Sequence, residues 1–289
     1  FYSKNQGRLI KKMHCYQSIK DLKDNIGNYN DIAFVPTMGN LHEGHLRLVE
    51  RAKSLSNNVV VSIFINPIQF NSKKDFDAYP KTLTNDKDLL KSVHADSIIF
   101  LPNEKDILSY IPFKQYALPE LAYDLCGKYR PGHFNGVIHI INILFNLIQP
   151  KFAIFGKKDY QQLKLIEKFS DEHYPTINII EEETVRASNF LALSSRNNLL
   201  SAKYKLKANE LYLALKKLIE KIKFTKNFDA VTKKTITSLN DSGWDVEYIS
   251  VRNQSNLKEP SSKDTKLVLL AAAKLNNIRL IDNIEFCID

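Results

Sequence analysis

The chain has 289 residues, of which 44% are hydrophobic and 25% are charged, and 41 Lys and Arg outnumber 32 Asp and Glu to give a net charge of +9. The two signs are mixed along the chain, so the basic excess suits anionic substrates, and no nucleic-acid partner is expected. No apolar run reaches the ~18–20 residues of a membrane span, and three cysteines without metal or redox spacing favour a reducing, cytoplasmic setting. A globular cytoplasmic protein without a membrane partner is therefore expected.

Strand-like and helical patterns alternate through the first two-thirds of the chain. Residues 1–12 precede Met13 and are expected to form a tail of uncertain status. Strands are predicted at 32–35, 59–65, 97–101 and 153–155, and helices near 42–55, 84–93, 135–148 and 158–170. This alternation predicts an α/β fold with a doubly wound parallel sheet over residues 13–184, with ligands at the carboxyl ends of the strands.

The pattern changes after residues 177–185. An amphipathic helix is predicted at 203–224 and another at 229–239, followed by strands at 246–251, 267–273 and 279–284. We therefore expect a smaller C-terminal α+β domain over residues 185–289.

Residues 36–45, PTMGNLHEGH, follow the first predicted strand and open a helix. Gly39 and Gly44 allow a ligand close to the backbone, and His42 and His45 share one face of the first helical turn. Such histidines can bind phosphate oxygens, and one can pass a proton to a leaving group. Ordinary capping histidines remain an alternative; a metal pair is less favoured, because its usual spacing is i, i+4 and no third ligand is evident.

Two further motifs lie at the ends of predicted strands. The amides of Asn66 and Gln69 can orient a hydroxyl or a carboxylate, although a polar turn around Pro67 would look the same. In FGKKDYQQ, Lys158 can meet a phosphate and Gln162 a substrate hydroxyl, with a solvated charge run as the alternative.

Three more candidates lie in loops or near helix starts. Ser194, Ser195 and Arg196 in LSSRN could clamp a triphosphate, or could simply cap a helix. An acyl-enzyme serine is not favoured because no Gly-x-Ser-x-Gly elbow surrounds Ser194. Arg130 projects from the stiff RPGHF loop, and Asp86 is a candidate magnesium contact.

Taken together, the motifs PTMGNLHEGH, VVVSIFINPIQF, YPKTLTND, RPGHFNGV, FGKKDYQQL, LALSSRN and RLIDN resemble, in order and spacing, those of the pantothenate synthetase (pantoate:beta-alanine ligase) family. The resemblance runs from about Met13 to Ile284. The alternatives are another HxGH nucleotidyltransferase, which would adenylate a different small acid or a phosphate ester, and a basic nucleic-acid-binding protein.

The resemblance implies a Rossmann-like domain, a closing C-terminal domain and a homodimer. It also implies that pantoate and beta-alanine condense at the expense of ATP, with Mg²⁺, through a pantoyl-adenylate. By motif, the ATP site would comprise Met38, Gly39, Asn40, Leu41, His42, Glu43, Gly44, His45, Gly156, Lys157, Lys158, Asp159, Val185, Leu193, Ser194, Ser195 and Arg196. Pantoate would contact Met38, Gln69 and Gln162, beta-alanine would lie near Gln69, and magnesium would bind near Asp86. The catalytic groups would be His42, His45, Lys158 and Arg196, with His45 as the proton donor.

The chain departs from the family pattern at a few positions. Cys126 and Lys157 each stand where the family commonly has Glu, Asn189-Phe190 replaces a common Asp-Gly, and Asn276 replaces a frequent Gly. Because losing a glycine stiffens a loop, the change at Asn189-Phe190 is expected to affect the rate of domain closure rather than the type of reaction.

Overall fold

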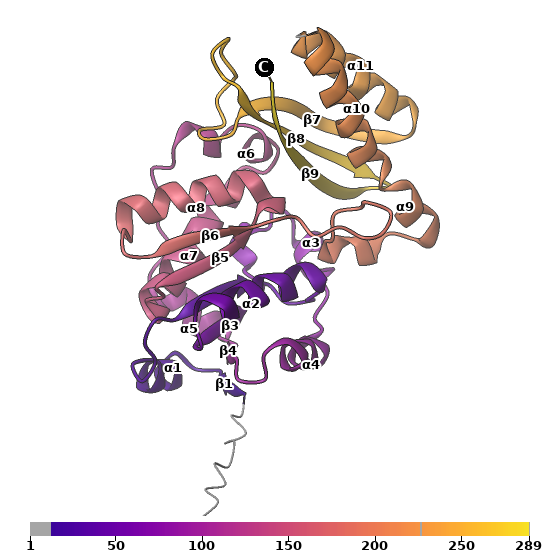
Figure 1. The fold of residues 1–289 in the computed structure, drawn as a ribbon. Coiled ribbons are helices and arrows are strands. Elements are labelled where there is room, and N and C mark those ends of the chain that lie inside the picture. The colour runs from indigo at the N-terminus through magenta and orange to yellow at the C-terminus, as the bar shows by residue number, and fades with distance from the viewer. Residues whose placement is uncertain (1–12, 226, 289) are drawn as a thin grey trace, which may run out of the picture.

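The computed structural model describes residues 13–225 and 227–288, so the predicted tail at residues 1–12 lies outside the described residues. Its larger part is a six-stranded parallel sheet with the strand order β1-β4-β3-β2-β5-β6 (Figure 1). The strands are β1 (His14–Tyr16), β2 (Ala33–Thr37), β3 (Val59–Ile63), β4 (Ile98–Phe100), β5 (Phe152–Gly156) and β6 (Asn178–Glu182). The predicted doubly wound sheet is confirmed, and the two edge strands β1 and β6 are additions to the four predicted strands.

Helices cover both faces of this sheet. The helices α2 (Glu43–Leu55) and α4 (Leu83–Val93) pack on one face. The other face is covered by α1 (Ile19–Ile26), α5 (Glu104–Tyr110), α7 (His133–Ile148) and α8 (Tyr160–His173). Because both faces are covered, the central strands read as nearly continuous apolar runs, and Val59, Val60 and Val61 are fully buried.

The strand order places a topological switch beside β2. The chain proceeds outward from β2 to β3 and β4, and then returns to the opposite side of β2 to form β5. The loops that follow β2 and β5 therefore diverge, which opens a crevice at the carboxyl ends of these strands. Two of the predicted motifs, at residues 36–45 and 156–162, begin at this point.

The smaller part is an antiparallel sheet of β7 (Trp244–Asn253), β8 (Lys266–Leu275) and β9 (Ile278–Cys287). One face packs against α10 (Glu210–Thr225) and α11 (Phe228–Asp241). The predicted helix at 203–224 is wrong as one element, because α9 (Ala202–Lys207) ends before α10 begins. Asn276 and Asn277 join β8 to β9 with φ values of 49° and 63°. Asn tolerates this left-handed conformation, so replacement of a frequent Gly at residue 276 preserves the turn. The predicted boundary at residue 185 stays a prediction; it falls between the two sheets.

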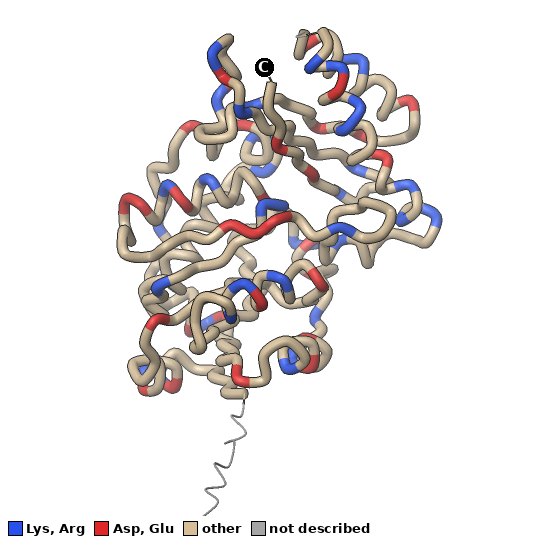
Figure 2. The backbone as a smooth tube through the Cα atoms, viewed as in Figure 1, with Lys and Arg blue, Asp and Glu red and all other residues tan. Residues whose placement is uncertain are grey.

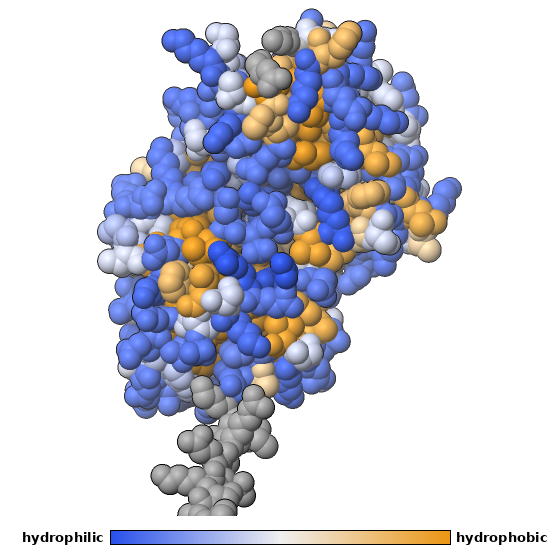
Figure 3. All heavy atoms as spheres, in the orientation of Figure 1, coloured by the Kyte–Doolittle hydropathy of each residue, from blue (hydrophilic) through white to orange (hydrophobic). Residues whose placement is uncertain are grey.

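Short elements complete the larger part: α3 (Lys73–Asp77), α6 (Cys126–Tyr129) and the 3-10 turns η1 (Pro67–Gln69), η2 (Glu120–Ala122) and η3 (Lys157–Asp159). A fourth turn, η4 (Ser195–Leu199), follows the link to the smaller part. Lys and Arg are interspersed with Asp and Glu along the backbone (Figure 2), and hydrophilic residues cover most of the face shown in Figure 3. None of the helices in the described part of the chain is long and apolar enough to cross a membrane.

Candidate active site

Asp86 shapes the loop that follows β2. Gly39 and Asn40 adopt φ values of 78° and 49°, which turn the chain sharply before α2. The backbone N–H of Asn40 donates to Asp86 Oδ2 at 3.0 Å, and that of Leu41 donates to Asp86 Oδ1 at 2.8 Å. Thr82 Oγ1 donates to the same Oδ1 at 3.0 Å. The carboxylate therefore replaces the partners that these turn amides lack.

This geometry argues against the assignment of Asp86 to magnesium. Its side chain is only 1% exposed, and both of its oxygens accept hydrogen bonds from the protein. It does not line the main cavity, and lies instead behind the loop, beside Pro80 and Lys81. Across residues 13–225 and 227–288, no group of three or more His, Cys, Asp and Glu could hold a metal ion. Asp86 is therefore a loop-positioning residue.

His42 and His45 cap the N-terminus of α2 reciprocally. The N–H of Gly44 donates to His42 Nδ1 at 3.2 Å, and the N–H of His42 donates to His45 Nδ1 at 3.3 Å. Because each Nδ1 accepts a hydrogen bond, the proton of each neutral ring resides on Nε2. The ring centroids are 4.1 Å apart. The capping alternative and the phosphate-binding reading are thus compatible, since the cap itself sets which nitrogen can donate to a ligand.

Both imidazoles are neutral near pH 7. Burial, followed by the charge of Lys158, lowers the pKa of His42 from 6.5 to about 4. Burial, His42 and Lys158 together hold the pKa of His45 well below its ordinary value. In the protein without a bound nucleotide, His45 is therefore a neutral hydrogen-bond donor, and its role as the proton donor stays a prediction. A bound polyanion would favour the protonated form and raise both pKa values.

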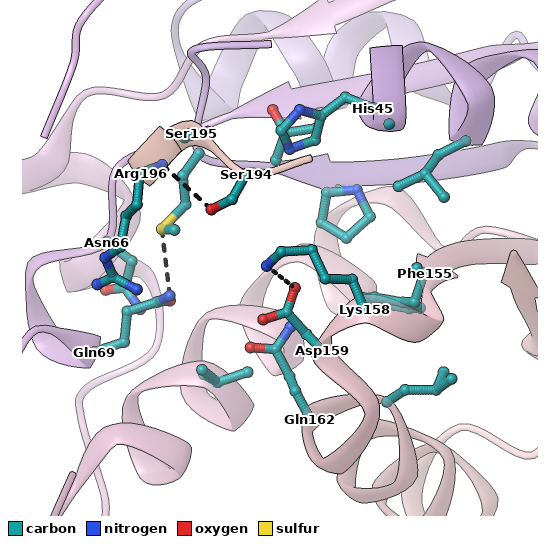
Figure 4. Close-up of a pocket in the computed structure, with 18 of the residues that line it drawn as sticks. His45, Asn66, Gln69, Phe155, Lys158, Asp159, Gln162, Ser194, Ser195 and Arg196 are labelled. Atoms are coloured by element: carbon teal, nitrogen blue, oxygen red, sulfur yellow. Dashed lines mark hydrogen bonds and ion pairs between the residues drawn. The ribbon is translucent and has the colours of Figure 1, made fainter. Parts of the chain in front are cut away.

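These groups meet in a cavity of about 250 Å³ (Figure 4). The predicted site residues that line it are Met38, His42, Gly44, His45, Gln69, Gly156, Lys158, Asp159, Gln162, Val185, Leu193, Ser194, Ser195 and Arg196. The predicted residues that do not line it are Gly39, Asn40, Leu41, Glu43, Asp86 and Lys157. Glu43 is exposed on the first turn of α2.

Asn40 acts indirectly, by joining two loops that are far apart in sequence. Its Nδ2 donates to the Ser195 carbonyl at 3.3 Å, and Ser195 Oγ donates to the Asn40 carbonyl at 3.1 Å. The N–H of Arg196 donates to Ser194 Oγ at 3.2 Å, and its guanidinium pairs with Asp75 at 2.9 Å. The histidine loop and the Ser-Ser-Arg loop therefore form one wall.

The amide of Gln69 is oriented by its neighbours. Asn66 Nδ2 donates to Gln69 Oε1 and to the Gly136 carbonyl, both at 3.0 Å, and Gln69 Nε2 lies 3.3 Å from Met38 Sδ. A Cβ on Gly136 would approach Gln69 N within 2.8 Å, so this glycine lets α7 lie directly against η1. Gln69 is thereby held across the cavity from Lys158 and Gln162 (Figure 4).

The two lysines after β5 point in different directions. Lys158 lines the cavity and pairs with Asp159 at 3.4 Å. Lys157 instead pairs with Glu183, Glu285 and Glu181 at 2.6, 2.9 and 3.2 Å. Burial lowers the pKa of Lys157, but these carboxylates outweigh burial and raise it above its ordinary value. The Lys157 side chain therefore links the end of β6 to β9, and its assignment to ATP stays a prediction.

Sequence reasoning underrated Arg130 and missed His133. His133 Nδ1 donates to the Gln69 carbonyl at 2.8 Å, so its Nε2 accepts from Arg130 Nη1 at 2.9 Å. Burial and the charge of Arg130 lower the pKa of His133 to about 3. Both side chains line the cavity, as do Tyr79 and Thr184. The RPGHF motif was the available signal for Arg130 and His133.

The Asn189-Phe190 departure lies in a tight turn beside the site. The N–H of Phe190 donates to the Ala187 carbonyl at 2.8 Å, and Phe190 has a φ of 71°. Its half-exposed ring stacks on Tyr212 of α10, with centroids 5.9 Å apart. A bulky residue thus occupies a conformation that favours glycine, while its ring packs against α10.

Comparison with known proteins identifies the family of the chain. The family model described as pantoate-beta-alanine ligase matches residues 9–285. The chain is 43% identical over 276 residues to a pantothenate synthetase of Neisseria meningitidis, covering 94% of this chain and 99% of that protein. A pantothenate synthetase of Acinetobacter baumannii is 45% identical over 255 residues, covering 88% and 90%.

Solved structures give the same result. The pantothenate synthetase of Thermus thermophilus superposes with a TM-score of 0.86 at 32% identity, covering 94% of this chain and 99% of that one. The pantoate-beta-alanine ligase of Francisella tularensis, complexed with beta-gamma ATP and beta-alanine, superposes with a TM-score of 0.79 at 33% identity, covering 94% and 97%. The chain therefore belongs to the pantoate-beta-alanine ligase family.

Proposed function

We propose that this cavity performs the reaction for which the family is named. ATP and (R)-pantoate form a pantoyl-adenylate and pyrophosphate, and beta-alanine then displaces AMP to give pantothenate. The main observation behind the proposal is that one cavity, at the topological switch point between β2 and β5, brings several groups together. These groups are the two histidines that cap α2, Gln69, Lys158 and the Ser194–Arg196 loop. The family assignment argues against the alternative of another nucleotidyltransferase.

ATP would lie along the wall formed by the histidine and serine loops. The Nε2–H groups of His42 and His45, the ammonium of Lys158 and the guanidinium of Arg196 supply donors around the phosphates. Binding at the N-terminus of α2 adds a favourable dipole. As the α-phosphate is attacked, negative charge moves onto pyrophosphate, and these fixed donors stabilise it without reorganising.

Magnesium fits this site only through the nucleotide. Asp86 is unsuited because its oxygens already hold the loop, and the carboxylates that line the cavity are those of Asp159 and Glu183. Magnesium normally takes few protein carboxylates beside substrate phosphates. We therefore assign the ion to the triphosphate, near Asp159, where it would neutralise phosphate charge.

Pantoate would lie between the amides of Gln69 and Gln162, which suit a hydroxy acid because they both donate and accept hydrogen bonds. Gln69 is oriented by Asn66, so its position is set before substrate binds. Beta-alanine would lie near Gln69, with its carboxylate toward the guanidinium of Arg130. Such positioning brings the amine to the activated carbonyl, and no protein nucleophile is required.

The adenylate is hydrolysable, so water must be excluded until the amine attacks. Asn283 of β9 donates to the carbonyls of Lys157 and Lys158 at 2.9 and 3.0 Å, which connects the smaller domain to the loop after β5. We propose that residues 185–289 act as a lid through this contact. We also expect a cytoplasmic homodimer, which light scattering of the purified protein would test.

The decisive assay measures AMP release while each acid is omitted in turn. We expect AMP to form at the full rate only when pantoate and beta-alanine are both present. Isotope exchange between pyrophosphate and ATP should require pantoate alone, because the adenylate forms first. ATP hydrolysis that is indifferent to both acids would refute the proposal.

A further inference from the structure

A second cavity, of about 70 Å³, lies where α6 faces the three-stranded sheet (Figure 1). It shares wall residues with the main cavity, including Arg130, and extends away from it to Cys126, Tyr248 and Arg279. None of these three residues lines the main cavity. The far end of this cavity is therefore separate from the groups assigned to ATP and pantoate.

Arg279 has a hydrogen-bond donor that its ion pair leaves unused. Arg279 Nε donates to Glu247 Oε2 at 2.8 Å, and Lys274, which also contacts Glu247 at 3.4 Å, has Asp245 as a second partner at 3.5 Å. Arg279 Nη2 is buried and has no hydrogen-bond partner among the described residues. A buried guanidinium nitrogen without an acceptor is costly.

Arg130 has no carboxylate partner. Its hydrogen bonds go to His133 Nε2 and to the Gln69 carbonyl, and no described carboxylate pairs with it. Cys126, which is 9% exposed, lines this cavity together with Arg130, Tyr248 and Arg279. Two guanidinium groups therefore line the cavity, and among the described residues only that of Arg279 is paired with a carboxylate.

We propose that this cavity binds a small monovalent anion such as chloride, between Arg130 and Arg279 and beside Cys126. The volume suffices, because one water molecule occupies about 30 Å³ in the liquid. Arg279 Nη2 supplies a donor without a hydrogen-bond partner among the described residues, and Tyr248 also lines the cavity. The anion would hold α6 of the larger part against β7 and β9 of the smaller one. Arg130 would then contact both this anion and the carboxylate of beta-alanine.

The test is thermal unfolding of the whole protein without ATP or either acid. Potassium chloride replaces potassium gluconate at constant ionic strength, so that only the small anion changes. We expect the unfolding midpoint of the wild-type protein to rise saturably with chloride, as ligand binding to the folded state requires. A midpoint that is the same in both salts would overturn the proposal.

Two substitutions at one position sharpen the test. Cys126→Glu supplies a permanent carboxylate, so its midpoint should no longer respond to chloride. Cys126→Ser keeps a side chain of similar size without adding a carboxylate, and should retain the response. Cys287→Glu adds the same charge at an exposed position of β9 and should also retain it. If Cys126→Glu responds to chloride as the wild type does, the site is wrong.

Arg279→Gln provides a second route if Cys126→Glu fails to fold. It removes the charge while leaving an amide, and should abolish the saturable response. Titration with pantoate or beta-alanine tests whether the site binds a substrate instead. If either acid raises the unfolding midpoint, Arg279→Gln abolishes that rise and chloride has no effect, then the two arginines bind a substrate carboxylate and the proposal fails. Because no turnover is measured, these results are independent of the ligase assay.

Discussion

Replacing Asp86 by Asn separates a loop-positioning role from a magnesium-binding role. The amide keeps one acceptor, but its NH₂ group must face either the Asn40 or the Leu41 N–H, both of which now donate at 2.8–3.0 Å. A lost charge-assisted hydrogen bond costs about 1.5–3 kcal/mol, and neutralising the remaining one costs about 1 kcal/mol. We therefore expect the free energy of unfolding to fall by about 3 kcal/mol.

The assay is urea unfolding in the presence of EDTA, so that no metal contributes, followed by AMP release over a range of magnesium concentrations. The matched control is Asp88→Asn on the same helix, whose side chain is 69% exposed and pairs only with Lys91 at 3.5 Å. It should change stability by less than about 1 kcal/mol. If Asp86→Asn unfolds like the wild type in EDTA but needs more magnesium for activity, our reasoning is wrong and Asp86 binds the ion.

Three further predictions concern catalysis, pH and backbone strain. His45→Ala and Lys158→Ala should each raise the activation free energy of adenylate formation by about 2–4 kcal/mol, seen as a slower single turnover. Glu43→Ala, on the same helix turn as His45, should leave the rate unchanged. Unchanged rates in both His45→Ala and Lys158→Ala would refute their assignment. In the unfolded chain the pKa of His133 is near 6.5, whereas burial lowers it to about 3 in the folded protein. The contribution of neutral His133 to the free energy of unfolding is therefore fully present above pH 6.5, and falls by about 1.4 kcal/mol per pH unit between pH 6.5 and 3. His133→Gln should flatten that fall in urea titrations between pH 6.5 and 4, and an equally steep fall would contradict it. Phe190 has a φ of 71°, so the free energy of unfolding, measured in urea, should be about 1 kcal/mol higher for Phe190→Gly than for Phe190→Ala. Both variants lose the ring stack, but only glycine relieves the backbone strain. The reverse order would refute this prediction.

The sequence alone determined the central sheet and the region of the site. The continuous apolar runs of β2, β3 and β5 indicate strands that are buried on both faces of a parallel sheet. The carboxyl ends of such strands share one edge of the sheet. The motifs that follow those strands, including those that contain His45, Gln69 and Lys158, must therefore lie at the same edge of the sheet. The ordered motifs also identified the family before any distance was known.

Only the tertiary structure decided the roles of individual charged groups. Asp86 and Lys157 carry no local signal that separates a ligand contact from a structural ion pair, because decisive partners are distant in sequence: Leu41 lies 45 residues from Asp86, and Glu285 lies 128 residues from Lys157. The neutral state of His45 depends on its burial and on Lys158, which lies on a distant segment of the sequence.

The same reason explains the unbalanced guanidinium groups beside Cys126. A sequence shows which charges a chain carries, but the pairing of Arg279 with Glu247, and the lack of a carboxylate for Arg130 in the described structure, arise only when α6 meets the smaller sheet. Hydrophobic periodicity is local and survives in the sequence, whereas electrostatic balance is a property of the folded interior.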